Sequence, residues 1–155
     1  MNYYIADLHL GHENIIRLQG RPFESVEEMD EALVRNWNAT VKGCDTVYIA
    51  GDLIYKSAEP EKYLSELKGK KVLIKGNHDC GWLKKADPEK YFVNVVDIAL
   101  ENIENRVVTM CHYPMLEWKN SRKEGSKKLG FLVHGHIHAR TDTENIKRFS
   151  RCRTR

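Results

Sequence analysis

Residues 71–79 read KVLIKGNHD, an apolar run that passes directly into a glycine, an amide, an imidazole and a carboxylate. The run Lys71–Lys75 predicts a strand, and Gly76 allows the backbone to turn sharply where that strand ends. Asn77 and His78 are then residue types that bind metal ions or phosphate, placed at the tip of a strand. Because ligands in open α/β sheets bind beyond the carboxyl ends of strands, this stretch predicts both a sheet and a site at its edge.

The same pattern recurs at four other strand tips. In each, an apolar segment is followed within a few residues by Asp, His or both: Asp7-x-His9, Gly51-Asp52, His112-Tyr113-Pro114 and Gly135-His136-x-His138. Residues i and i+2 of an extended segment face the same way, so the D-x-H and H-x-H tips can each offer two ligands to one cavity. Each motif alone is common in proteins without a metal site, but their joint occurrence after strands predicts a shared metal centre.

Helical periodicity is clearest in the segment that begins at Ser25. Ser25 followed three positions later by Glu28 has the form of a capping box. The apolar residues that follow recur at spacings of three and four, which predicts one buried helix face: Val26, Met29, Leu33 and Trp37. Shorter helices are expected at residues 13–19 and from Pro60 onward.

Other apolar segments predict strands. Three of them lie at the N-terminus, before Gly51 and before the last tip: Tyr3–Ala6, Asp45–Ala50 and Phe131–Val133. Residues 93–100 and 106–111 predict a hairpin with a polar turn across Asn102–Asn105. The early order of strand, helix, strand, helix, strand favours α/β layering, to which the hairpin adds antiparallel pairing.

Length and composition indicate one globular domain. The chain has 155 residues, of which 41% are hydrophobic and 30% charged, an ordinary globular composition. Lys147–Arg155 holds five basic groups and no acid, so the other 146 residues carry 20 basic and 22 acidic groups despite the overall charge of +3. We therefore expect a domain over residues 1–146 and a basic tail over 147–155. A body with a net charge of −2 does not favour binding of nucleic acids larger than nucleotides.

Several features favour a cytoplasmic protein without a membrane segment. No apolar run approaches the ~20 residues that span a bilayer, and the N-terminus has no basic region followed by a cleavage site. The cysteines Cys44, Cys80, Cys111 and Cys152 form no C-x-x-C pair, so we expect reduced thiols.

The predicted ligands also indicate which metals would bind. Carboxylates and imidazoles without a thiolate suit Mn²⁺, Fe, Zn²⁺ or Ni²⁺ and disfavour Cu(I) and iron–sulfur clusters. Seven ligands exceed what one tetrahedral ion needs, whereas two ions that share one bridging carboxylate would use them all. Two such cations neutralise phosphate charge and lower the pKa of a bridging water from ~15.7 toward neutrality, so that the resulting hydroxide attacks a phosphomonoester or phosphodiester.

The five motifs resemble those of the calcineurin-like metallophosphoesterases, and their short spacings are most similar to those of small bacterial phosphoesterases. The resemblance runs from Asp7 to His138. It implies a four-layer α-β-β-α sandwich in a single domain, with the metals at one edge. The function it implies is that of a hydrolase acting on phosphoester bonds, with a small phosphoester as substrate and two divalent ions as cofactors, Mn²⁺ first among them.

The resemblance also implies a role for each site residue. One ion would be bound by Asp7, His9, Asp52 and His138. The other would be bound by Asp52, Asn77, His112 and His136, so that Asp52 bridges. His78 would not ligate but would face the substrate phosphate as the catalytic residue.

One departure from the family pattern and two other functions bear on this interpretation. Tyr55 stands where the Ser/Thr protein phosphatases of the superfamily have a second Asp, which weakens a protein-phosphatase function. The first alternative is a protein-binding scaffold on the same fold, which the presence of His78 and all seven ligands disfavours. The second is a nuclease, which the lack of interleaved aromatic and basic residues disfavours.

Several neighbouring residues have two interpretations each. Asp79 either orients a histidine of the site or belongs to a turn. His12 either lines the site or starts a helix near solvent, and His134 is expected behind the ligands or in the core. A group of three residues after the His112 motif either shapes the substrate entrance or forms a solvated basic loop: Trp118, Lys119 and Arg122.

Overall fold

Four parallel strands form the first sheet of the computed structural model, which describes residues 1–103, 106–123 and 129–138. Across the sheet the order is β1 (Asn2–Ile5), β2 (Thr46–Ile49), β3 (Lys70–Ile74) and β4 (Asn94–Val96). Helices lie in every connection between successive strands, so all four strands run the same way. Their carboxyl ends therefore meet at one edge.

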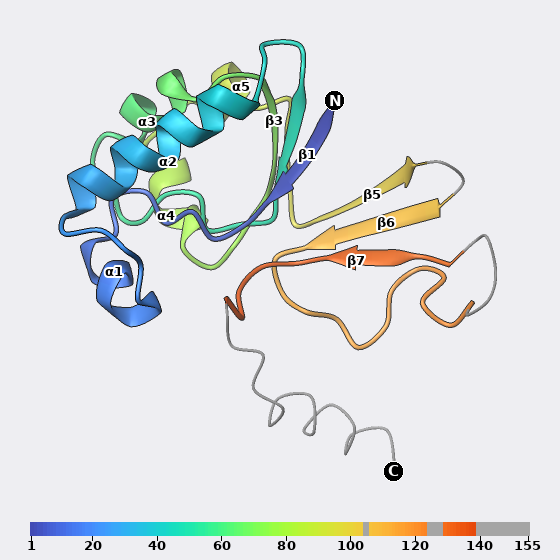
Figure 1. Ribbon diagram of the computed structural model, residues 1–155. Coiled ribbons are helices and arrows are strands. Elements are labelled where there is room, and N and C mark those ends of the chain that lie inside the picture. Colours follow the sequence, from blue (N-terminus) through green and yellow to red (C-terminus); the bar gives the residue numbers. More distant parts are fainter. Residues whose placement is uncertain (104–105, 124–128, 139–155) are drawn as a thin grey trace.

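The helices of the described residues lie on one side of this sheet (Figure 1). They are α1 (Glu13–Gln19), α2 (Val26–Thr40), α3 (Pro60–Glu66), α4 (Asp79–Leu83) and α5 (Pro88–Tyr91). The predicted start of α2 is confirmed, because the Glu28 amide donates to the Ser25 hydroxyl at 3.1 Å. The Glu28 carboxylate accepts from the Glu24 amide at 2.8 Å, one residue before the partner that a capping box would use. The short helices α4 and α5 were not predicted.

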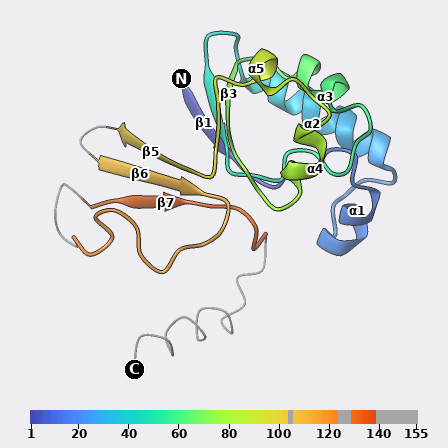
Figure 2. The same ribbon diagram turned by 180° about the vertical axis from the view of Figure 1, so that it is seen from behind.

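A second sheet packs on the other side of the first (Figure 2). It contains β5 (Ile98–Ile103), β6 (Arg106–Cys111) and β7 (Phe131–Val133), with β5 antiparallel and β7 parallel to β6. The predicted hairpin is correct for β5 and β6, although its turn residues 104–105 lie outside the described part of the chain.

The predicted strand 93–100 is wrong as one element. Its first half is β4, which pairs with β3 in the first sheet, and its second half is β5 in the second sheet. The chain passes between the sheets at Asp97, which is exposed and pairs with Lys75 at 3.0 Å.

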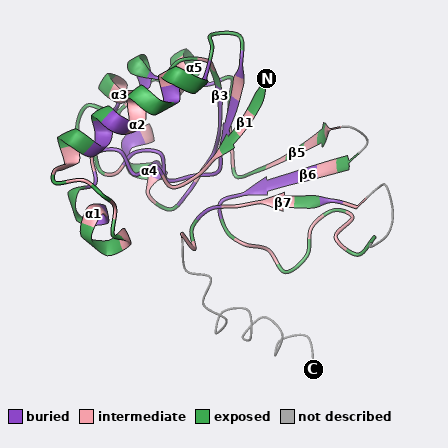
Figure 3. Ribbon diagram, in the orientation of Figure 1, coloured by how far each residue is buried: buried purple, intermediate pink, exposed green. Residues whose placement is uncertain are grey.

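Two apolar cores hold these layers together, as the buried strands in Figure 3 indicate. Side chains alternate along a strand, so Leu73 of β3 packs toward the helices whereas Val72 and Ile74 pack against the second sheet. Val108 and Met110 of β6 supply the opposite side of that second core. The first sheet is thus buried on both faces, as parallel sheets require.

The expected α/β fold is confirmed, and the described residues supply the helix, sheet and sheet layers of the sandwich. Among these residues there is no second helical layer, and the predicted tail at 147–155 lies outside them. None of the helices that the structure describes has both the length and the apolar character needed to cross a bilayer.

Candidate metal centre

The first two tips continue side by side after their strands end. The amides of Asp7, His9 and Leu10 donate to the carbonyls of Gly51, Asp52 and Leu53 at 3.0–3.1 Å. This ladder places the Asp7-x-His9 segment against Asp52.

Two of the glycines allow the tips to approach one another closely. Gly51 has a φ of +86°, and a β-carbon there would overlap the ring of His112. A β-carbon on Gly76 would overlap the carboxylate of Asp52. Any other residue at either position would force the tips apart.

A buried carboxylate fixes the position of the second tip relative to the third. The Asp79 side chain is fully buried and accepts from the amides of Asp52, Leu53 and Gly76 at 2.8–3.0 Å. It also accepts from the Trp82 indole at 2.9 Å. Burial raises the pKa of Asp79, and these hydrogen bonds oppose that increase. Asp79 thus positions the backbone of two strand tips, a role that neither of its two interpretations, orienting a histidine or belonging to a turn, had described.

We expect Asp79→Asn to lower both stability and metal affinity. An amide brings a donor to a position where four donors already converge, and each buried group left unpaired costs about 1–3 kcal/mol. Urea unfolding and metal titration measure the two effects. Asp97→Asn, at a carboxylate that is 82% exposed, is the matched control. Equal unfolding free energies for the two variants would contradict this role of Asp79.

The backbone at the tips is strained. Five of the predicted ligands adopt the left-handed region, with φ values of 51–70°: Asp7, His9, Asp52, His136 and His138. The expectation of extended backbone at the D-x-H and H-x-H tips is therefore wrong. Such conformations cost of order 1–3 kcal/mol each and persist where surrounding contacts enforce them, commonly at functional sites.

Arg21 supplies one such contact. Its guanidinium donates to the carbonyls of Asp7 and Leu8, both at 2.7 Å. Nothing in the sequence around Arg21 indicated this role.

One group of predicted ligands forms around the first and last tips. Asp7, His9 and His138 each offer a ligand atom within 4.8 Å of the others. The Nε2 atoms of His9 and His138 lie 3.3 Å apart. The His136 amide also donates to the Asp7 carboxylate at 3.0 Å, which ties these two tips together.

A second group lies beside it. The Asn77 Oδ1 atom is 3.1 Å from His112 Nε2 and 3.0 Å from His136 Nδ1. His112 Nδ1 donates to the Ala50 carbonyl at 2.8 Å. That bond leaves the His112 Nε2 lone pair directed at Asn77 and Asp52.

Asp52 stands between the two groups. Its Oδ2 atom lies 3.7 Å from His9 Nε2 and 3.5 Å from His112 Nε2. Its Oδ1 atom accepts from the His78 amide at 2.9 Å, while the His78 ring stays farther away, with Nε2 3.9 Å from Asp52 Oδ2. All seven predicted ligands and His78 thus come together at one edge of the sheets.

His12 and Tyr55 complete one side of the centre. His12 Nδ1 is 3.4 Å from His9 Nδ1, so His9 keeps its other ring nitrogen for the cluster. The rings of His12 and Tyr55 stack with centroids 3.6 Å apart, and Tyr55 meets His78 edge-on. His12 lines the site cavity, which was one of its two expected roles. The contact made by Tyr55 was not predicted.

Burial lowers the pKa values of several of these imidazoles and so favours their neutral form. Burial, and after it the charges of neighbouring His138, His12 and His78, together lower the pKa of His9 to about 3. Burial, followed by a neighbouring histidine in each case, also lowers the pKa values of His12 and His136. Neutral imidazoles are the form that binds metal ions.

This depression predicts a pH dependence of stability without metal. Between pH 6.5 and about 3, His9 binds a proton in the unfolded chain but not in the folded one. Unfolding therefore becomes easier as the pH falls, by about 2 kcal/mol between pH 7 and pH 5. Urea unfolding of chelator-treated wild type and His9→Gln tests this expectation. Identical pH dependences in the two proteins would contradict it.

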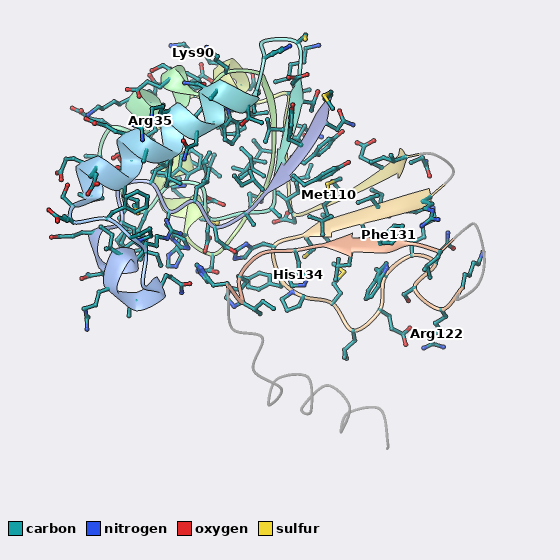
Figure 4. All side chains as sticks on the ribbon, in the orientation of Figure 1. Arg35, Lys90, Met110, Arg122, Phe131 and His134 are labelled. Carbon is teal, nitrogen blue, oxygen red and sulfur yellow. The ribbon has the colours of Figure 1, made fainter. Side chains whose placement is uncertain are left out.

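The remaining candidates contact residues outside the set of predicted ligands. Arg122, which pairs with Glu117, lies at the opposite end of β7 from His134 (Figure 4). The Trp118 indole donates to the Gly130 carbonyl at 3.0 Å. These contacts fit the solvated loop rather than the substrate entrance. His134 is half-buried, and its ring donates to the Gly135 carbonyl at 3.0 Å.

The described cysteines are free thiols, as expected. Cys44 and Cys80 are exposed and Cys111 is buried. Cys152 lies outside the described residues.

The protein has two sheets with helices on one side. Carboxylates, imidazoles and an amide lie together at the strand ends, which defines an α/β protein with a candidate metal centre. The chain belongs to the calcineurin-like phosphoesterase superfamily, whose sequence profile matches residues 3–150. Membership supports a metal-dependent phosphoesterase in general, and the Asp/His clusters are suited to bind divalent metal.

Three similar proteins have descriptions that name no activity. An uncharacterized protein of Methanocaldococcus jannaschii is 35% identical over 141 residues, which cover 88% of this chain and 69% of that protein. The Gene 66 protein of Mycobacterium phage L5 is 26% identical over 166 residues, 88% of this chain and 77% of that one. A solved protein of unknown function from Aquifex aeolicus has a TM-score of 0.63 at 24% identity, covering 99% of this chain and 70% of that one. This last similarity supports the fold alone.

Proposed function

We propose that the chain hydrolyses a small phosphomonoester or phosphodiester with two divalent metal ions. The observation that carries this proposal is the position of Asp52, whose Oδ2 atom faces His9 on one side and His112 on the other at 3.7 and 3.5 Å. A carboxylate shared by two groups of ligands suits a bridge between two ions.

The donor set fits such a pair. Asp7, His9 and His138 with Asp52 would hold one ion, and Asn77, His112 and His136 with Asp52 would hold the other. Each set has four oxygen or nitrogen donors and no sulfur, a composition suited to Mn²⁺, Fe, Zn²⁺ or Ni²⁺. Of these ions, we propose Mn²⁺ as the one that the centre most readily uses.

The side chains around the two proposed ions suggest how a phosphoester would be bound and cleaved. Bound divalent ions would neutralise phosphate charge and acidify a water molecule. Among the three histidines whose ring nitrogens lie 3.5–3.9 Å from Asp52 Oδ2, His78 is 36% exposed, whereas His9 and His112 are buried. This exposure supports the proposal that His78 contacts a phosphoryl oxygen or gives a proton to the leaving group, a role worth typically 10²–10⁴-fold in rate.

The test combines metal content with turnover. Protein freed of metal by prolonged chelation is reloaded with Mn²⁺, Fe²⁺, Zn²⁺ or Ni²⁺ and analysed by metal mass spectrometry. It is then assayed on bis(4-nitrophenyl) phosphate, 4-nitrophenyl phosphate and a nucleotide panel. We expect two ions per chain, turnover that disappears with chelator, and lower rates at acidic pH, because ligands must be unprotonated.

The same experiment separates the alternatives. Full activity in excess chelator would contradict metal catalysis. Two bound ions without turnover of any phosphoester would favour the scaffold, and preferential cleavage of DNA or RNA would favour the nuclease.

A further inference from the structure

A cavity of about 480 Å³ opens directly over the candidate metal centre. This volume lies in the range of ~300–1,000 Å³ typical of sites for small molecules. Five histidines line the cavity, four from the cluster and the neighbouring His12: His9, His12, His78, His136 and His138. The rest comes from Ile15, Leu18 and Gln19 of α1, from Pro114 and from Ile137. The cavity is therefore larger than a site for phosphate alone.

Helix α1 forms one wall of this cavity. In Figure 1, α1 lies on the side of the molecule toward which β6 and β7 point. Ile15 is the only buried residue of this helix and fixes it to the body. Leu18, one turn further on, is 60% exposed and lines the cavity. An exposed leucine on the wall of a polar site is available to contact a ligand.

The chemistry of the wall differs from that of the centre. Among the described lining residues there is no Lys, Arg, Asp or Glu. Apart from the histidines, the polar side chain that lines the cavity is that of Gln19. These side chains offer no cationic partner for a second phosphate or a carboxylate. They do offer apolar surface, which favours an uncharged group roughly in proportion to the area it buries.

We propose that this wall is a subsite for the organic group of the substrate, and that this group is uncharged and apolar, as an aromatic ring is. The inference rests on the proposed function and narrows its substrate class to phosphoesters with one charged phosphate and an apolar ring. In a phosphomonoester the organic group is the leaving group, so the ring belongs on that side of the phosphate, in the cavity that His78 also lines. Gln19 supplies one hydrogen-bonding group for a polar ring edge.

Binding measurements with phosphonates test the subsite without requiring turnover. Phenylphosphonate and methylphosphonate present similar anionic head groups and differ in the ring. Calorimetric titration of the Mn²⁺-loaded protein is expected to give tighter binding of phenylphosphonate, by about 10-fold, since small apolar contacts in a pocket are worth this much. 4-Phosphonobenzoate, whose ring carries a charge, is expected to lose that advantage.

Variants then locate the subsite. Leu18→Asn is expected to reduce the preference for phenylphosphonate while binding of methylphosphonate and the metal content are kept. Leu18→Met retains apolar surface and should retain the preference. Leu100→Asn is the matched control, because Leu100 is 55% exposed on β5 and does not line the cavity.

Several results would overturn the proposal. Equal affinities for the two phosphonates in the wild type would exclude a ring subsite, and an unchanged preference in Leu18→Asn would exclude α1 as its wall. Tighter binding of 4-phosphonobenzoate would exclude an uncharged ligand. A clear phenylphosphonate preference in a protein that hydrolyses no phosphoester would instead overturn the proposed function and leave the subsite standing.

Discussion

Replacing Asp52 by Asn is expected to remove metal binding and activity together. Asp52 Oδ2 faces ring nitrogens of both ligand groups, so one substitution changes both proposed ion sites. An amide is a weaker ligand and carries no charge, so two nearby cations would repel each other without compensation. Loss of residues that merely support a metal ligand typically costs 10–100-fold in affinity, and we expect more than about 10²-fold for the bridge itself.

The geometry makes this result distinguishable from unfolding. In the Asp52→Asn variant, the side-chain oxygen of the new amide would still accept from the His78 backbone amide, a bond of 2.9 Å in the wild type. Metal mass spectrometry, turnover and urea unfolding of the same preparations separate the effects, with the exposed Asp87→Asn as control. If Asp52→Asn kept two ions at wild-type affinity, the bridging role would be wrong.

The strand tips were predictable because their signal is local. A glycine followed by Asp52, or by Asn77 and His78, comes directly after an apolar run, and parallel strands must bring such ends to one edge. The start of α2 at Ser25 was predictable for a similar reason, since its cap lies within one turn of the helix.

The division of residues 93–100 was not predictable in the same way. Val96 of β4 and Ala99 of β5 both pack in the core between the sheets, so the apolar pattern continues through the crossing at Asp97. Strand pairing depends on partners far away in sequence, and an apolar pattern does not identify the partner.

Sequence patterns also could not predict the contacts that support the site. Asp79 accepts from backbone amides 26 and 27 residues earlier, and Arg21 holds the carbonyls of Asp7 and Leu8. Tyr55 stacks on His12 from a different segment. Each contact follows from how the tips pack, whereas ligand types follow from the chemistry that a metal requires.

His78 provides the sharpest distinction between binding and chemistry at this centre. Its side chain is more exposed than those of His9 and His112, and its Nε2 atom is 3.9 Å from Asp52 Oδ2, farther than theirs. Its backbone amide, which binds Asp52, is unaffected by a change of side chain. His78→Asn is therefore expected to keep both ions and the fold.

Turnover of His78→Asn should nevertheless fall by roughly 10²-fold or more, as loss of a general acid or of charge stabilisation does. The loss should be smaller for a diester that releases nitrophenolate, because that leaving group needs little protonation. Metal content and kcat on substrates with good and poor leaving groups measure both effects, with His134→Asn as the matched control. If His78→Asn loses metal as Asp52→Asn does, His78 is a ligand. If it keeps wild-type kcat on the poor leaving group, protonation by His78 is not part of the reaction.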